Sequence, residues 1–226
     1  MGEAQQRGAR ARSRRRRGRQ LLPAQPRLAR AVGELAVGAL SACRLAAAGA
    51  QFIQVDEPAA SARMDELPLV AEAMAIVTDG LNAHAITHIC YGDFMQAYPT
   101  MLDIPVDQID LEMANSGYDL LDRFRDIPFT KAIGLGVVDV HSHRIESVDE
   151  AADGIRRALE VLPPERVFVD PDCGLKTRTV EEAKDKLRVV VEAARRVREE
   201  RGIGDVLPGR GSTPGRSLGA PRPASA

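Results

Sequence analysis

From residue 51 onward, the chain alternates short apolar, β-prone runs with longer stretches that have a helical pattern. The apolar runs lie at residues 51–55, 84–89, 108–111, 132–138 and 166–169. The stretches that we expect to be helical follow at about 64–81, 93–102, 116–125, 147–161 and 179–201. The strand starts are separated by 33, 24, 24 and 34 residues, which is typical of βα units around a parallel sheet. The sequence therefore predicts an α/β fold of five βα units, arranged either as a doubly wound sheet or as a section of a (β/α)₈ TIM barrel.

Two of the helices can be assigned a candidate buried face from the spacing of their apolar residues. In the stretch 179–201, the residues at helical spacing are Val180, Ala183, Leu187, Val190, Val191, Ala194 and Val197. A further helix is predicted over residues 27–48, with Leu28, Val32, Leu35 and Leu45 as candidates for its buried face. Cys43 lies in that helix, and we expect it to be a small buried apolar residue.

The formal net charge of −1 is an average over unlike parts of the chain. Residues 1–49 carry eleven Arg and two Glu, residues 50–207 carry 17 basic and 30 acidic residues, and residues 208–226 carry three Arg and no acid. We expect a disordered Arg-rich segment at 1–26, a partial catalytic barrel at 27–205, and a disordered Gly/Pro/Arg tail at 206–226. The acidic body argues against nucleic acid as the main partner.

The cellular setting is indicated by what the sequence lacks. No apolar run approaches the roughly 20 residues of a membrane-spanning helix, so we expect no membrane association. The Arg-rich start is not followed by the apolar segment of a secretory signal. Three cysteines, at positions 43, 90 and 173, are too few and too scattered for a disulfide framework. These features predict a reducing, cytoplasmic location.

Reactive polar residues follow each predicted strand at its carboxyl end. Asp56 follows the first strand, His88 and Cys90 close the second, and Glu112 follows the third. The last two strands are followed by Asp139-Val140-His141-Ser142 and by Asp170-Pro171-Asp172-Cys173. In parallel α/β folds, binding and catalytic sites are built at this edge of the sheet. We therefore expect these residues to form one site.

Four of these residues suit a metal ion. His88, Cys90, Glu112 and Cys173 offer an imidazole, two thiolates and a carboxylate, a ligand set that fits tetrahedral Zn²⁺. His-x-Cys on a strand places both side chains on the same face, because the side-chain period is two. The alternative is that both cysteines are buried apolar residues and that His88 is a core histidine with satisfied hydrogen bonds.

Five segments of the sequence closely resemble one known family. They are QVDEPA (54–59), THICYGDF (87–94), DLEMANSGYDLL (110–121), IGLGVVDVHSHRIESV (133–148) and DPDCGLKTR (170–178). The family is the C-terminal catalytic domain of cobalamin-independent methionine synthase, and the resemblance covers about residues 46–201. It implies a (β/α)₈ barrel, of which this chain carries about five C-terminal βα units, because a complete barrel takes about 250 residues.

The resemblance also implies a reaction and roles for individual residues. The reaction is zinc-dependent transfer of a methyl group from 5-methyltetrahydrofolate, in its polyglutamate form, to the thiol of homocysteine. The family's zinc ligands match His88, Cys90, Glu112 and Cys173, its proton donor matches His141, and the residue that contacts the homocysteine amino group matches Asp56.

Several alternatives stay open. The segments around GDFMQAYPTM and LEMANSGYDLL are closer to a shorter group of the family, for which the methyl donor would be a methylcorrinoid. A methyltransferase of the related uroporphyrinogen-decarboxylase-like group also uses His-x-Cys and a distant Cys. Because the units expected before residue 46 are missing, a truncated and inactive product is the non-catalytic alternative.

Overall fold

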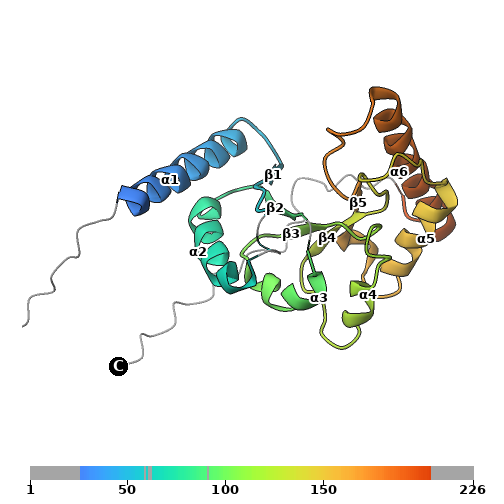
Figure 1. Cartoon of the computed structure of the whole chain (residues 1–226), viewed down its shortest axis with the longest axis horizontal. Helices are drawn as coiled ribbons and strands as arrows, with labels where there is room; N and C mark the ends of the chain where they lie inside the picture. The colour runs from blue at the N-terminus through green and yellow to red at the C-terminus, as the bar shows by residue number, and fades with distance from the viewer. Residues whose placement is uncertain (1–25, 59, 61–62, 91, 205–226) are drawn as a thin grey trace, which may run out of the picture.

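Five parallel strands form a single sheet in the order in which they occur along the chain. The computed structural model describes residues 26–58, 60, 63–90 and 92–204, and side chains from residue 37 onward. The strands are β1 (Phe52–Gln54), β2 (His84–Ile89), β3 (Gln108–Leu111), β4 (Ala132–Gly136) and β5 (Val167–Asp170) (Figure 1). Their order in the sheet is β1-β2-β3-β4-β5, and every neighbouring pair is parallel. A doubly wound sheet would reverse its strand order, so this sheet is a section of a barrel.

The sheet is curved so strongly that its two outermost strands approach each other. The ring centroids of Phe52 on β1 and Phe168 on β5 are 6.1 Å apart, and the ring of His84 on β2 lies between 5 and 6 Å from both. In a flat sheet, strands four positions apart would be separated by roughly 19 Å. The side chains therefore meet across the concave face, as they do inside a closed barrel.

Helices flank the sheet and connect its strands. The α-helices are α1 (Pro26–Ala47), α2 (Leu67–Thr78), α3 (Phe94–Ala97), α4 (Leu120–Arg123), α5 (Val148–Ala158) and α6 (Val180–Arg201). Short 3₁₀ turns lie at η1 (Met64–Glu66), η2 (Thr100–Asp103) and η3 (Pro164–Arg166). The helix α1 packs on α2 at one end of the arc, and α5 packs on α6 at the other (Figure 1). None of the described helices has both the length and the apolar character needed to cross a bilayer.

Local sequence signals explain where the longer helices begin and end. Ser147 and Thr179 each form a capping box with the glutamate three residues later, which fixes the starts of α5 and α6. Gly202 ends α6 in the left-handed conformation.

The predicted helices at 93–102 and 116–125 were too long. The first stops before Pro99, and the second starts only at Leu120, after Gly117 and Tyr118 adopt positive φ angles.

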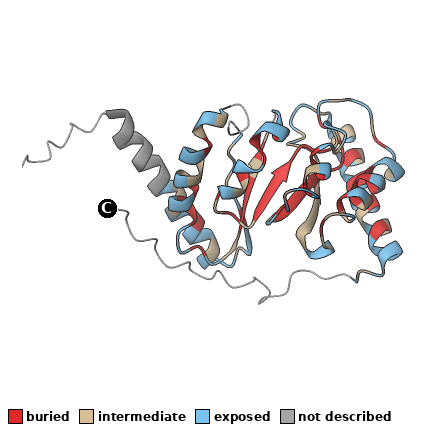
Figure 2. Cartoon of the chain, turned by 90° about the horizontal axis from the view of Figure 1, so that it is seen from below, coloured by how far each residue is buried: buried red, intermediate tan, exposed pale blue. Residues whose placement is uncertain are grey.

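The core lies at the middle of the sheet and under its helices. All residues of β3 and β4 are buried, as expected for parallel strands covered on both faces. Figure 2 shows buried residues gathered on the central strands and on the helix faces that are turned toward them. Packing on both sides therefore fixes the two central strands, which precede Glu112 and the loop of His141.

Several residues expected to be buried are exposed instead. On α6, Val180, Leu187 and Val191 are exposed, and Leu45 and Cys43 of α1 are exposed as well. The other residues proposed for the buried face of α1, Leu28, Val32 and Leu35, lie outside the described side chains.

The exposed large apolar side chains of the described residues are Val37, Leu40, Leu45, Phe52, Leu69, Ile76, Met95, Val180, Leu187 and Val191. All but Met95 lie on α1, β1, α2 or α6, at the two ends of the arc, where a closed barrel would continue.

The predicted terminal segments fall largely outside the described part of the chain. Residues 1–25 and 205–226 are not described, so the assignments of 1–26 and 206–226 stay predictions. Pro26 is the exception, because it begins α1.

Candidate metal centre

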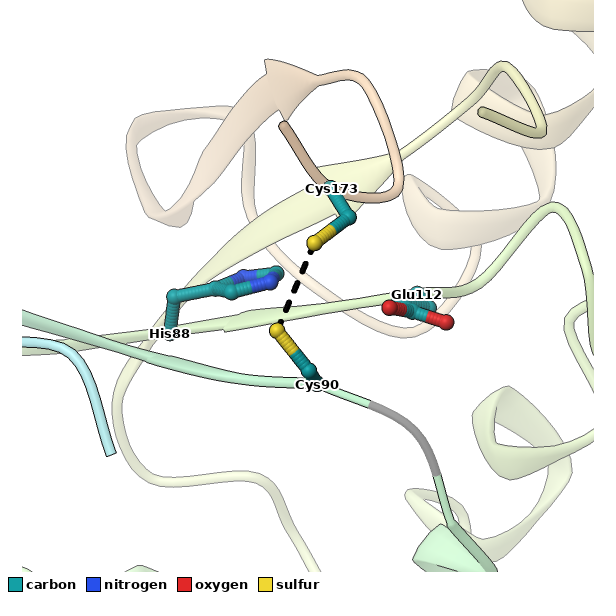
Figure 3. Close-up of side chains that lie close together, drawn as sticks. All are labelled: His88, Cys90, Glu112 and Cys173. Carbon is teal, nitrogen blue, oxygen red and sulfur yellow. Dashed lines mark hydrogen bonds between the residues drawn. The ribbon is translucent and has the colours of Figure 1, made fainter. Parts of the chain in front are cut away.

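The side chains of four residues converge at the carboxyl ends of the strands. His88 lies near the end of β2, Cys90 directly follows that strand, Glu112 follows β3, and Cys173 follows β5. One ligand atom from each, a ring nitrogen, two Sγ atoms and a carboxylate oxygen, lies within 4.8 Å of the other three. The two Sγ atoms are 3.3 Å apart (Figure 3). The structure thus brings together the four residues that the sequence nominated as metal ligands.

Two buried atoms in this cluster lack a hydrogen-bond partner among the described residues. They are Nε2 of His88 and Oε1 of Glu112, whose side chain is 2% exposed. A buried polar atom without a partner is costly, so such atoms point to a ligand that would satisfy them. In a tetrahedral zinc site the ligand atoms are about 3.3–3.8 Å apart, and small side-chain rotations would bring these four into that range. The donor set and its geometry therefore fit a metal ion, and His88 is not the fully satisfied core histidine of the alternative interpretation.

The environment of the cluster determines the protonation of two of its members. Burial lowers the pKa of His88, although the negative charges of Asp56 and Glu112 oppose that shift. Burial, followed by the neighbouring Cys173, raises the pKa of the Cys90 thiol to about 12. At neutral pH and without a metal, the imidazole is thus neutral and Cys90 carries its proton. An imidazole in this state can bind a metal, whereas the thiol must first lose its proton.

Asp172, the residue before Cys173, joins the loops that carry two of the four residues. Its buried carboxylate accepts hydrogen bonds from the backbone N–H groups of Ala114 and Asn115, at 2.9 and 2.8 Å. Burial raises the pKa of Asp172 to about 7. A Cβ atom on Gly136 would lie 2.1 Å from Oδ1 of Asp172, so the close approach of this side chain requires glycine there. Asp172 therefore fixes the segment after Glu112 relative to Cys173.

The two other predicted site residues lie beside the cluster. Nε2 of His141 is 3.4 Å from Oε2 of Glu112, and the backbone N–H of His141 donates to Asp139 Oδ1 at 2.8 Å. Asp139 thus orients the main chain of His141 by a contact that strand geometry did not predict. Asp56 is exposed at the end of β1, where its Oδ1 accepts a hydrogen bond from Gln54. Its charge acts on both His88 and Cys90.

The sequence interpretation missed three residues that shape this site. Asp172 stands in the DPDCGLKTR segment but was given no role. The other two, Glu146 and Lys186, form a buried ion pair between the loop after β4 and α6. A signal for Lys186 exists in hindsight, because it precedes the buried Val190, Ala193 and Val197 at helical spacing. A lysine in such a row is buried only when it has a partner.

A model of one known protein family matches most of the chain. Residues 24–196 match the sequence profile of a family described as "Cobalamin-independent synthase, Catalytic domain". A curated methionine synthase of Saccharolobus solfataricus is 42% identical over 156 residues, which are 69% of this chain and 47% of that protein. A methionine synthase of Sulfurisphaera tokodaii is 38% identical over 157 residues, 70% of this chain and 46% of that protein. The chain thus spans about half the length of the curated relatives that it matches.

Solved structures agree with the sequence comparison. The B12-independent methionine synthase of Shewanella sp. W3-18-1, solved in complex with selenomethionine, superposes with a TM-score of 0.68 and 25% identity. The match covers 74% of this chain and 54% of that one. A structure from Listeria monocytogenes, with a TM-score of 0.59 and 19% identity over 76% of this chain, shares the fold alone.

Proposed function

Because the chain belongs to the family of cobalamin-independent synthase catalytic domains, we propose that it carries the metal-binding part of a methyltransferase that forms methionine from homocysteine. The observation that carries this proposal is the cluster of His88, Cys90, Glu112 and Cys173, two of whose buried atoms have no partner in the described part of the chain. The methyl donor that we propose first is 5-methyltetrahydrofolate in its polyglutamate form.

We propose zinc as the metal of this cluster. Two thiols and an imidazole select a soft or borderline cation, and Zn²⁺ accepts a carboxylate as the fourth ligand. His88, Cys90, Glu112 and Cys173 would hold the ion, and one of these ligands would have to be displaced by the homocysteine thiol. The ion would then supply the positive charge that keeps this thiol as a thiolate near neutral pH. A reducing compartment, which we expect to be the cytoplasm, would keep Cys90 and Cys173 available as thiols.

Asp56 is proposed to bind the amino group of homocysteine. Its carboxylate is exposed at the end of β1, close enough to affect the pKa of both His88 and Cys90. A carboxylate in that position can pair with the substrate ammonium and orient the thiol toward the cluster. Asp56 would therefore act on substrate binding more than on the methyl-transfer step.

His141 is proposed to supply the proton that the leaving group needs. When the methyl group moves from N5 of the folate to sulfur, the electron pair of the broken C–N bond stays on nitrogen. That nitrogen is a poor leaving group unless it is protonated, and a general acid within reach supplies the proton. The ring of His141, 3.4 Å from Glu112, lies beside the cluster, where such a proton would be delivered.

A methylcorrinoid is the second candidate donor, and the length of the relatives favours it. The 156 matched residues are 47% of the Saccharolobus solfataricus protein, so that protein is about 330 residues long. This is the size of one (β/α)₈ barrel without a second domain. The outgoing group would then be a reduced corrinoid, which leaves without taking up a proton. His141 would be dispensable for the transfer in that case.

The test is to restore a complete barrel and to assay each donor. A (β/α)₈ barrel has eight strands, and the described residues form five of them. We therefore expect these units to need the remaining three βα units of a relative to form a closed barrel. We expect the 226-residue chain alone to be inactive, and a fusion in which those units replace residues 1–45 to form methionine from homocysteine. A fusion that folds and binds zinc but transfers no methyl group from either donor would contradict the proposed reaction.

A further inference from the structure

A buried ion pair connects α6 to the loop that carries His141. Nζ of Lys186 lies 2.8 Å from Oε2 of Glu146, and these side chains are 0% and 6% exposed. Lys186 also donates to the backbone carbonyl of Arg144. A buried charge is tolerated only when it is paired and hydrogen-bonded, and both conditions are met here. The pair therefore holds two points of the loop, residues 144 and 146, against α6.

The second oxygen of Glu146 extends this connection to the start of the loop. Oε1 accepts a hydrogen bond from the backbone N–H of Asp139 at 3.0 Å. Asp139 in turn accepts from the backbone N–H of His141 at 2.8 Å. A continuous series of contacts thus runs from Lys186 through Glu146 and Asp139 to His141, whose ring is beside Glu112 of the metal cluster.

Packing alone does not fix this loop. Residues 139–146 form neither a helix nor a strand. Beside them lies a hollow of about 290 Å³, lined in part by Asp139, Ser142, Arg144 and Glu146. Val140 is buried and Ile145 packs against the core, but the loop borders an open hollow, so its position depends on polar anchors as well as on packing.

We propose that Lys186 and Glu146 are positioning residues that hold the 139–146 loop so that His141 faces the metal centre. The inference rests on the proposed function for the role of His141, but the position of the loop can be tested without turnover. The pair does not touch the four ligand residues in any contact that the described residues show. Its loss should therefore release the loop and leave the metal centre intact.

The test compares two double variants of the zinc-loaded 226-residue chain by hydrogen–deuterium exchange and mass spectrometry. In Glu146→Leu/Lys186→Met, apolar side chains of similar size replace the pair, so that no unpaired charge is left buried. The control is Arg156→Met/Glu200→Met, which removes another ion pair, between α5 and α6, that does not contact the loop. We expect amide exchange across 139–146 to rise at least about tenfold in the first variant only, with unchanged zinc content and unchanged protection of β4.

Turnover in the completed barrel adds a second readout. There, Glu146→Leu/Lys186→Met should lower kcat about tenfold or more and leave KM for homocysteine unchanged, because the ligands and Asp56 are untouched. Unchanged exchange across the loop would overturn the proposal. So would a rise that spreads equally over α6 and β5, because the pair would then merely stabilise the fold. A fully active His141→Asn variant would refute the proposed role of His141 instead. The exchange result would still decide whether Lys186 and Glu146 hold the 139–146 loop.

Discussion

The Sγ atoms of Cys90 and Cys173 lie 3.3 Å apart although the two cysteines are 83 positions apart in the chain. Cys90 follows β2 and Cys173 follows β5, with β3 and β4 between them. Strands three positions apart in a flat sheet would be separated by roughly 14 Å. The two thiols meet because the sheet curves as a barrel does and because the loop after β5 returns over the strand ends.

This proximity predicts a disulfide in the metal-free protein. With oxidised glutathione as the oxidant, one cysteine forms a mixed disulfide and the other displaces glutathione, which closes a Cys90–Cys173 bond after a shift of about 1.3 Å. We expect peptide mass spectrometry to find this bond in chain stripped of zinc and not in zinc-loaded chain. The exposed Cys43 should form only a mixed disulfide. Equal formation of Cys43–Cys90 and Cys90–Cys173 bonds would contradict the geometry.

Zinc uptake should release protons from the cluster. Cys90 is protonated at neutral pH, since its pKa is raised to about 12, and a thiol binds zinc only after it loses its proton. Zinc affinity should therefore increase about tenfold per pH unit for each proton displaced. Calorimetry at pH 6, 7 and 8, in buffers of different ionisation enthalpy, measures both the zinc affinity and the number of protons released. Cys43→Ser should behave as the unmodified chain, and an affinity that does not change with pH would contradict the ligand assignment of Cys90.

One substitution distinguishes between the two candidate methyl donors. In the completed barrel, His141→Asn should keep zinc and homocysteine binding. With the folate donor it should lose about 10²- to 10⁴-fold in kcat, the usual contribution of a general acid. With a methylcorrinoid the loss should be small, because the leaving group takes no proton. Asp56→Asn is the matched comparison and should raise KM for homocysteine with either donor. A His141→Asn variant that retains full activity with folate would show that another group supplies the proton.

The exposed apolar residues at the ends of the arc should make the isolated chain self-associate. Val190 and Val191 are neighbours on α6, but the first is 6% exposed and the second 57%. We expect Val191→Glu to raise the monomeric fraction in analytical ultracentrifugation without lowering Tm. Val190→Ala should lower the free energy of unfolding by about 2 kcal/mol and leave association unchanged. A parent chain that is fully monomeric at micromolar concentration would contradict this prediction.

The strands were predictable from sequence because each is a short apolar run whose ends are set by polar residues. The predicted 84–89 and 108–111 coincide with β2 and β3, and the other three strands differ by at most two residues at either end. The strand and helix pattern alone left the choice between a barrel and a doubly wound sheet open, because that choice depends on strand order. The family resemblance predicted the barrel, and the strand order β1-β2-β3-β4-β5 confirms it. The exposed face of α6 was also misjudged. Its apolar residues form two rows, and spacing alone cannot tell which row meets the sheet.

The convergence of the four candidate ligand residues was predictable, because parallel strands place their carboxyl ends at one edge. The contacts that hold the loop of His141 and the segment after Glu112 were not. Lys186 and Glu146 are 40 residues apart, and no local pattern pairs a lysine on a helix with a glutamate in a distant loop. Asp172 was visible in the sequence, but its role depends on the close approach of its side chain to Gly136. That approach is apparent only in the three-dimensional structure.

The most direct test of the account is zinc X-ray absorption on the purified chain, combined with elemental analysis. We predict about one zinc per chain, with two sulfur ligands near 2.3 Å and two nitrogen or oxygen ligands at about 2.0–2.2 Å. Cys90→Ser/Cys173→Ser should lose the sulfur signal and most of the zinc, whereas Cys43→Ser should keep both. Zinc content that is unchanged in the double variant, or a spectrum without sulfur ligands in the parent chain, would contradict the proposed metal centre.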